Sequence, residues 1–283
     1  MSWPASGSTP APSAGRTRSW SGRRWRYGGW RPSRRDFGRT VSSWAAVAPG
    51  VIRPDRILLT PNLPGWEGLA LADRLAGEFG VPAVAVANDV RAGALAEARL
   101  GALRGADLGL YVSLGTGIAA AIVVGGQVLA GAHQAAGEIG YMDPGGAPAG
   151  AVAAGRAPLE EAVAGKGLGE RASALLGEEV TADQLFGRTD TAARELVAAA
   201  LELLAAALGN LCVFADPERI VLGGGMMAAA GTVVPALTRS LAARVPFPPE
   251  VRPARFLRDA SLHGAVALAL EGTASGGRIP QAR

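Results

Sequence analysis

The 283-residue sequence is poor in the residues that build disulfides and metal clusters. It contains one cysteine, Cys212, and two histidines, His133 and His263, whose spacing does not suit a shared metal ion. A single thiol excludes an intramolecular disulfide and any multi-cysteine metal site, which favours a reducing compartment and a cytoplasmic location. Cys212 lies in the apolar stretch LCVF and is expected to be a small core residue.

Lysine, aromatic residues and long hydrophobic runs are also scarce. Lys166 is the only lysine, and aromatic residues make up 5% of the chain, although hydrophobic residues make up 49%. The apolar runs are interrupted before the roughly 20 residues needed to cross a bilayer, so we expect no membrane partner. Abundant alanine and glycine instead predict a globular core of small-residue helices and buried strands.

The excess of basic residues is confined to the N-terminus. Residues 1–40 carry nine arginines and one acid, a net charge of +8, whereas the whole chain has a net charge of +4. The rest of the chain is therefore mildly acidic, which argues against a specific nucleic-acid surface. Residues 1–40 lack helical or strand periodicity and are expected to form a disordered Arg/Trp/Ser-rich tail. Its interleaved tryptophans leave open stacking on single-stranded nucleic acid.

From residue 41 onward, strand-like and helical patterns alternate, which predicts parallel strand pairing and an α/β architecture. Strands are expected at 41–51, 56–59, 81–87, 110–114, 118–124, 127–130 and 219–222. Helices are expected at 66–79, 90–103, 159–176 with a break at 165–167, 181–188, 191–214, from 226 onward, and 262–270. The Ala/Leu-rich helix at 191–214 is apolar on most sides, which predicts a buried central helix.

The most informative stretch runs from residue 110 to 141. Two apolar runs flank Gly115-Thr116-Gly117, and a glycine-flanked carboxylate, Glu138, follows them. This pattern predicts a hairpin whose turn directs backbone N–H groups and a hydroxyl toward a phosphate. An ordinary core hairpin would show the same pattern, so the neighbouring segments have to decide between the two.

Two other strand ends carry residues suited to a ligand cleft. Asn88 and Asp89 end a buried strand and begin a helix, where the clefts of α/β sheets lie, although a helix cap explains the same pair. Gly223-Gly224-Gly225 follows a strand and precedes a helix. Glycines in that position let the backbone approach a ligand at a helix N-terminus.

Seven segments in order resemble the ROK family of sugar kinases and sugar-responsive repressors. They are APGV at 48–51, PNLPGW at 61–66, AND at 87–89, SLGTGIAAAIVVGG at 113–126, GAHQAAGEIGY at 131–141, PLEEAVAGKGL at 158–168 and DPERIVLGGG at 216–225. The resemblance implies an α/β, actin-like (ribonuclease H-like), two-lobed ATPase fold. It divides the chain into a partial N-terminal lobe at 41–105, a C-terminal lobe at 106–261, and a helix within 262–283 that returns to the first lobe before a frayed tail.

The resemblance also implies a function: ATP-dependent phosphorylation of a hexose or amino-sugar hydroxyl, with ATP and Mg²⁺ as cofactors. It implies small-molecule partners and a homodimer or higher homo-oligomer. Asp89 would be the general base, and the sugar would be bound by Asn62, Asn88, Glu138, Tyr141 and Glu160. ATP would be cradled by Gly115, Thr116 and Gly117 at its phosphates and by Gly223, Gly224 and Gly225 beneath its adenosine. For Asn62 turn formation is the alternative, and for Glu138 and Glu160 it is a solvated surface carboxylate.

Two features depart from the family pattern. The family's D-x-G-G-T loop, whose backbone grips phosphate and whose aspartate helps to hold magnesium, does not occur before Val41. The N-terminal lobe is therefore expected to be incomplete, with an exposed sheet edge. Tyr141 replaces the family's zinc-binding histidine, and the loop at 145–158 has no cysteine, so we expect no structural zinc.

These departures leave a second function open. A non-catalytic ROK-type regulator would bind a sugar without phosphorylating it. A DNA-binding repressor ranks below both readings, because residues 1–40 contain no pattern that predicts a helix-turn-helix.

Overall fold

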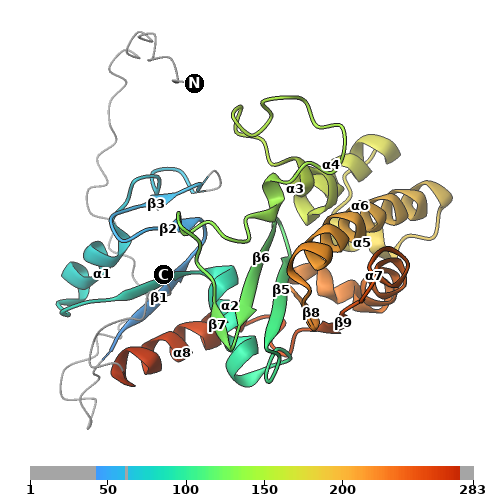
Figure 1. Cartoon of the computed structure of the whole chain (residues 1–283). Coiled ribbons are helices and arrows are strands. Elements are labelled where there is room, and N and C mark those ends of the chain that lie inside the picture. Colours follow the sequence, from blue (N-terminus) through green and yellow to red (C-terminus); the bar gives the residue numbers. More distant parts are fainter. Residues whose placement is uncertain (1–42, 61–62, 275–283) are drawn as a thin grey trace, which may run out of the picture. The chain divides into compact units, whose positions relative to one another are not determined.

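A computed structural model describes residues 43–60 and 63–274 (Figure 1). The tail expected at 1–40, the candidate sugar contact Asn62 and the C-terminal tail lie outside the described residues. The main sheet is mixed, with the strand order β7-β6-β5-β8-β9. Its strands are β5 (Leu108–Leu114), β6 (Ile118–Val124), β7 (Gln127–Val128), β8 (Arg219–Gly223) and β9 (Glu250–Pro253).

Strands β5 and β8 form the middle of the main sheet and determine where its ligand-facing turns lie. β5 pairs antiparallel with β6, which forms the expected hairpin, and parallel with β8. Both strands are buried along most of their length, as expected for strands covered on both faces. Because Ser113 lies opposite Gly223, the turn after β5 and the glycine triplet after β8 emerge at the same edge of the sheet.

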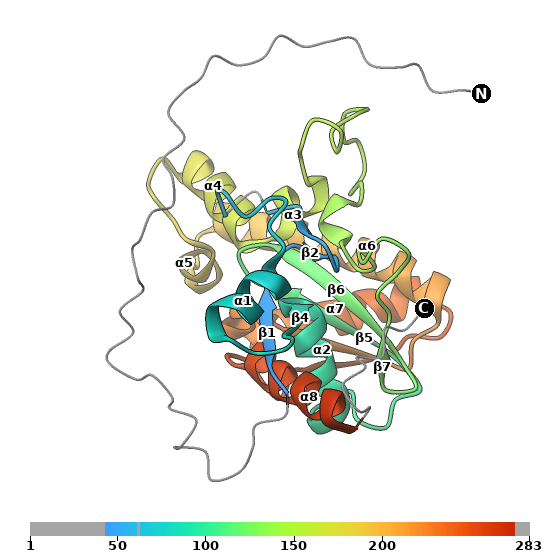
Figure 2. The same ribbon diagram turned by 90° about the vertical axis from the view of Figure 1, so that its left-hand side faces the viewer.

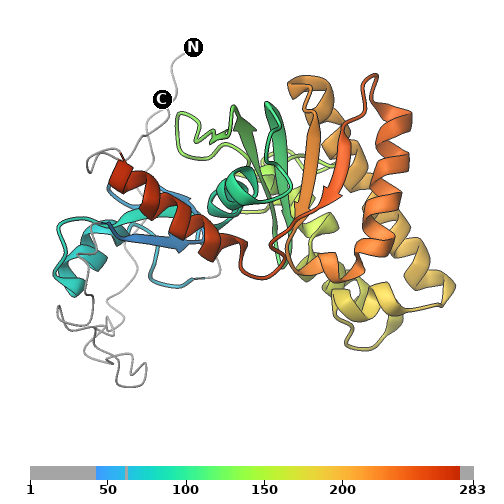
Figure 3. The same ribbon diagram turned by 90° about the horizontal axis from the view of Figure 1, so that it is seen from below.

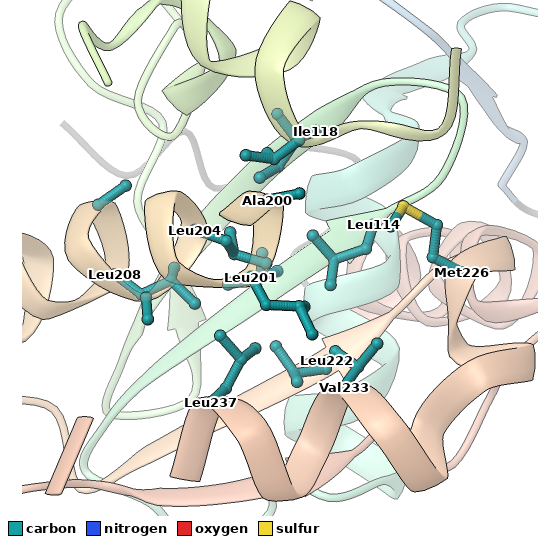
Figure 4. Close-up of a cluster of buried hydrophobic side chains, with 14 of the residues drawn as sticks. Leu114, Ile118, Ala200, Leu201, Leu204, Leu208, Leu222, Met226, Val233 and Leu237 are labelled. Atoms are coloured by element: carbon teal, nitrogen blue, oxygen red, sulfur yellow. The ribbon is translucent and has the colours of Figure 1, made fainter. Parts of the chain in front are cut away.

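Helices cover both faces of the main sheet. On one face, α6 (Thr191–Ala215) and α7 (Ala230–Arg244) pack their leucines against β5 and β8, as Figure 4 shows for Leu204, Leu222 and Leu237. On the other face lies α2 (Asp89–Leu100), whose Ala94 contributes to a smaller core with Tyr111. Alternate residues of β5 therefore face the two different cores.

Two helical segments, Thr191–Ala215 and Gly225–Arg244, are long and apolar enough to cross a membrane by length and composition. Glu195 and Glu202 still interrupt the apolar run of the first segment. The apolar composition of α6 serves packing, because Leu201, Leu204 and Leu208 fill the core on the main sheet (Figure 4). A buried core helix needs an apolar surface of the same extent as a membrane span.

The segment that precedes the main sheet forms two short strand pairs and one helix. β1 (Ala45–Ala48) pairs parallel with β4 (Ala85–Asn88), and β2 (Val51–Ile52) pairs antiparallel with β3 (Ile57–Leu58). Helix α1 begins at Leu71 and ends at Phe79, later than the expected start at residue 66. Positive φ angles at Gly65 and Gly68 produce successive turns there, which a helix cannot accommodate.

The remaining elements connect the main sheet to its helices. They are η1 (Ile139–Tyr141), α3 (Pro158–Val163), α4 (Gly165–Leu176), α5 (Ala182–Gly187) and η2 (Gly225–Ala229). The expected cap at Thr181 is confirmed: its hydroxyl accepts from Gln184 N, and Gln184 Oε1 accepts from Thr181 N, a reciprocal capping box. The strand β9 was not predicted, since the prolines that surround it are typical of loops.

The last helix, α8 (Ala260–Ala274), packs against α2 and the β1–β4 pair (Figures 2 and 3). Ser43 Oγ donates a hydrogen bond of 2.5 Å to Ala269 O, a residue 226 positions further along the chain. The two helices approach each other closely at Gly264, where an added Cβ would lie 1.9 Å from Ala92 O.

Gly264→Ala is expected to lower the free energy of unfolding by about 1–3 kcal/mol, because the added methyl would push α8 away from the backbone of α2. For a chain of this size, each kcal/mol corresponds to a fall of roughly 2–4 °C in the melting temperature. Gly77→Ala is the matched control, since Gly77 lies inside α1 with open space around its missing Cβ. Equal melting temperatures for both variants would contradict the close contact.

Candidate functional site

Asn88 and Asp89 lie where β4 ends and α2 begins, and their side chains have different roles in the structure. Asn88 Oδ1 accepts from Val90 N at 2.9 Å and from Arg91 N at 3.1 Å, and its Nδ2 donates to Gly50 O at 2.9 Å. The buried amide of Asn88 is therefore committed to capping α2 and holding the β1–β2 turn. Its expected sugar contact stays a prediction.

Asp89 is engaged much less. Its Oδ1 accepts from Val90 N at 3.0 Å, and its other oxygen bonds to no other described residue. Burial raises the pKa of Asp89, while the hydrogen bond from Val90 N lowers it to a smaller extent. A half-buried carboxylate with an open oxygen at the start of a helix is suited to accept a proton from a ligand.

The turn between β5 and β6 is held in place by the first turn of α4. Gly115 O accepts from Gly165 N at 2.8 Å, and Thr116 O accepts from Lys166 N at 3.1 Å, so the first turn of α4 lies directly against this turn. Thr116 itself is exposed. The positive end of a twelve-residue helix and exposed turn atoms suit an anionic group such as phosphate.

The glycine triplet after β8 lies beside this turn. Gly224 has φ +89°, and a Cβ there would lie 2.4 Å from Leu114 O. A Cβ at Gly115 would likewise have the triplet as its neighbour, at 3.9 Å from Gly225 N. The chain passes this closely only because Gly224 has no side chain and adopts a conformation that other residues rarely do. The two glycine turns thus form one backbone-lined surface, which fits the phosphates and ribose of a nucleotide.

Glu138 is positioned by a second close backbone approach. A Cβ at Gly137, whose φ is +93°, would lie 1.9 Å from Ala120 O, and Gly137 O accepts from Ala120 N at 2.7 Å. This contact holds the loop against β6 and places Glu138 at the start of η1. Glycine at 137 is therefore required by geometry, and the backbone at Glu138 is held relative to the main sheet.

The candidate acidic groups lie close enough for their charges to act on one another. Burial raises the pKa of Glu138, the charge of Arg91 lowers it, and the charges of Asp89 and Glu160 raise it further. Burial also raises the pKa of Tyr141, and so do the charges of Glu138, Glu160 and Glu67. The structure therefore brings together the four candidates Asp89, Glu138, Tyr141 and Glu160.

Glu160 connects this acidic group to the glycine turn. Its Oε2 accepts from Ile118 N at 3.0 Å, and a Cβ at Gly117 would lie 2.3 Å from the same oxygen. The carboxylate belongs to α3, so a helix on one side of the site is bonded to the first residue of β6. Glu160 is therefore not a solvated surface carboxylate, because its side chain is half-buried and accepts a hydrogen bond.

Three residues near the site were missed by the sequence reasoning. Arg91 follows Asp89 by two positions, and its guanidinium donates to Gln134 from across the site. Glu67 accepts from Thr60 N and Oγ1 at 3.3 and 3.2 Å, and its charge acts on Tyr141. The closeness of Arg91 to a candidate base was the one signal that could have identified it.

Cavity volume and metal-ligand clusters do not locate the site. A groove of about 1000 Å³ runs between α5, α6 and α7, lined by residues such as Phe186, Arg194 and Arg239, and it includes none of the candidates. Within the described part of the chain, no three His, Cys, Asp or Glu side chains are grouped to hold a metal ion. The site is identified by its converging strand ends and interacting charges.

The family comparison and the similar proteins and structures point to the same family. Residues 33–272 match the ROK family. The kanosamine kinase of Amycolatopsis mediterranei is 32% identical over 258 residues, which are 87% of this chain and 82% of that protein. The ROK hexokinase of Thermus thermophilus is also 32% identical, with a TM-score of 0.68 over 81% of this chain and 79% of that structure.

A further solved relative is a ROK glucokinase from Streptomyces griseus, in complex with glucose and AMPPNP. It is 25% identical to this chain, with a TM-score of 0.68 over 83% of each chain. The α/β fold described above is thus the fold of ROK kinase structures, and the sequence match extends over most of the described residues. The chain belongs to the ROK family.

Proposed function

We propose that this chain is an ATP-dependent sugar kinase that transfers the γ-phosphoryl group of ATP to a hydroxyl of a hexose or amino sugar. The observation that carries the proposal is the hydrogen bond from Ile118 N to Glu160, because it joins the acidic group around Asp89 to the glycine turn. A sugar among the carboxylates would then lie next to a nucleotide on the glycine surface. The sugar-kinase names of the relatives support this reading.

In the proposed reaction Asp89 removes the proton from the sugar hydroxyl as its oxygen bonds to the γ-phosphorus. The bond between that phosphorus and the β–γ bridging oxygen breaks, and ADP leaves. Such transfers depend mainly on positioning and charge stabilisation, and Mg²⁺ bound with ATP would help to neutralise the developing negative charge. Glu138 and Glu160 would accept hydrogen bonds from other sugar hydroxyls, and Tyr141 can both donate and accept one.

The glycine turns would hold ATP. Gly115, Thr116 and Gly117 would face its phosphates, where the start of α4 adds a favourable dipole. Gly223, Gly224 and Gly225 would lie beneath the adenosine. The surface that they form has room for a ligand because a Cβ at Gly225 would contact nothing within 4 Å.

The chain would be arranged as two lobes. An actin-like N-terminal lobe at 41–105 and a C-terminal lobe at 106–261 would face each other across the site. The packing of α8 on α2 and on β1 and β4 supports assigning the last helix to the N-terminal lobe. A cytoplasmic homo-oligomer is the proposed form of the protein.

A second candidate function is that of a sugar-binding regulator without catalysis. One observation favours it: no D-x-G-G-T phosphate loop precedes Val41 in the 283 residues. The N-terminal lobe would then be incomplete, and the glycine turns of the C-terminal lobe would be the only phosphate grip. Such a protein would keep sugar affinity and lose phosphoryl transfer.

The two functions are separated by measuring transfer and binding on the same preparation. We expect ADP release, in an assay coupled to NADH oxidation, with at least one of glucose, glucosamine, N-acetylglucosamine and N-acetylmannosamine. Sugar binding detected by calorimetry without ADP release would establish the regulator instead. A chain that neither binds nor phosphorylates any of the four sugars would contradict both functions.

A further inference from the structure

Arg91 connects the first turn of α2 to the loop that carries Glu138. Its Nη1 donates to Gln134 Oε1 at 3.0 Å, and its Nη2 donates to Gln134 O. The side chain and the backbone of one loop residue are thus held by the two arms of one guanidinium. A planar fork of this kind restricts orientation as well as distance.

Gln134 needs such support because its backbone is strained. Its φ is +60°, a left-handed conformation that residues other than glycine adopt at a cost of about 1–3 kcal/mol. The loop has a second attachment three residues later, where Ala120 N donates to Gly137 O. Glu138 follows that attachment directly, so the segment from 134 to 138 is fixed to α2 at one end and to β6 at the other.

The charge of Arg91 also reaches Glu138. The titratable groups that face Glu138 are Arg91 and Asp89 from α2, Glu160 from α3, and Tyr141 from η1. Arg91 is the one cation among them, and its guanidinium is committed to Gln134 without a direct ion pair to Glu138 within this described group. The Glu138 oxygens therefore stay open to a ligand while the nearby cation favours the ionised carboxylate.

We propose that Arg91 is a positioning residue for sugar recognition, which clamps the loop at 131–138 to the helix that begins with Asp89. Acceptor and base are then held in one fixed arrangement, so the sugar meets a preformed pair. The inference rests on the proposed sugar-binding function and extends it to a residue that touches no substrate. A merely structural clamp would stabilise the fold but would not control how sugar affinity depends on pH.

The test measures the affinity of the wild type and four variants for the sugar that the wild type binds best among glucose, glucosamine, N-acetylglucosamine and N-acetylmannosamine. Calorimetry at a series of pH values gives the sugar affinity and its acid limb, which is the fall in affinity as the pH is lowered. A separate titration gives the affinity for ATP. Arg91→Lys keeps the charge without the fork, and Arg91→Gln removes both. Gln134→Gly removes the side-chain acceptor but suits the left-handed backbone.

Arg99→Lys is the matched control. Arg99 lies on the same helix and also bridges to distant segments, since it donates to Glu271 at 2.6 and 2.9 Å and to Gly126 O at 3.0 Å. It lies outside the proposed site. Any loss of fold stability common to replacing a bridging arginine on α2 will therefore appear in this variant as well.

We expect Arg91→Lys and Gln134→Gly to weaken sugar affinity by about tenfold, the loss of one charged hydrogen bond, with the acid limb unmoved. Arg91→Gln should weaken it at least as much and also move the acid limb to higher pH. The sign follows from charge: without the cation the pKa of Glu138 rises, so the ionised acceptor is lost earlier as the pH falls. ATP affinity should stay within twofold of wild type in all variants.

Failure of the proposed function and failure of the inference about Arg91 give different results. If the wild type binds none of the four sugars, the proposed function is overturned, and this inference with it. If the wild type binds a sugar, and the Arg91 variants change affinity and acid limb no more than Arg99→Lys does, this inference alone is overturned. Should Arg91→Gln not fold, the comparison of Arg91→Lys and Gln134→Gly with Arg99→Lys decides in the same way.

Discussion

Asp89→Asn is expected to reduce sugar phosphorylation by about 10²–10⁴-fold while sugar affinity changes little. The amide keeps the size of the side chain and can still accept from Val90 N, as Asp89 Oδ1 does in the structure. It cannot accept a proton from the attacking hydroxyl, and general-base catalysis contributes about this factor. Steady-state kinetics with the best sugar substrate and calorimetry with the same sugar measure the two effects separately.

Asp73→Asn is the control for this substitution. Asp73 is exposed and lies in the first turn of α1, as Asp89 lies in the first turn of α2, but it is not among the candidate site residues. Both variants remove one acid from a helix N-terminus, a change worth only about 0.3–1 kcal/mol of stability. Turnover of Asp89→Asn at the level of Asp73→Asn would rule out Asp89 as the base.

Gly224→Ala is expected to lower the free energy of unfolding by about 2–4 kcal/mol and to weaken ATP binding at least about tenfold. The alanine would have to adopt φ +89° with its Cβ 2.4 Å from Leu114 O, so both backbone strain and overpacking contribute. Relief of that clash would separate the triplet from the turn after β5. A displacement that costs 1.4 kcal/mol of binding already corresponds to a tenfold loss of affinity.

The neighbouring residue supplies the control. Gly225 is exposed and a Cβ there would meet nothing within 4 Å, so Gly225→Ala should melt within about 2 °C of wild type. Thermal unfolding and ATP titration of the two variants test the role of the contact. If Gly224→Ala bound ATP as tightly as the wild type does, the glycine surface would not be the nucleotide site.

Periodicity predicted most of the fold because the main elements have strong local signals. The hairpin of β5 and β6 was predicted from two apolar runs around Gly115-Thr116-Gly117, and α6 was predicted within one residue of its observed end at Ala215. Helix α1 was predicted five residues too early, because the apolar spacing continues through turns at Gly65 and Gly68. Proximity of the first and last segments could not come from local pattern at all.

The candidate site was predicted where residues follow strand ends and missed where it depends on contacts across the chain. Asp89 and Glu138 stand beside strand or glycine signals that the sequence displays. Arg91 and Gln134 are 43 positions apart, and nothing in the spacing of either segment indicates that they meet. Glu160 was proposed only through resemblance, and its hydrogen bond to Ile118 N depends on tertiary packing.

The contact between the two ends of the described chain sets the order in which the protein can be completed. Strands β1 and β4 and helix α2 are synthesised early, yet the helix that covers them, α8, is the last of the described elements to be synthesised. Closing a contact such as that of Ser43 with Ala269, 226 residues apart, carries a large loop-closure entropy and is slow to form. The main sheet can fold before α8 is synthesised, whereas β1, β4 and α2 stay uncovered until α8 packs on them, so we expect this part of the protein to be open to chaperones and proteases until then.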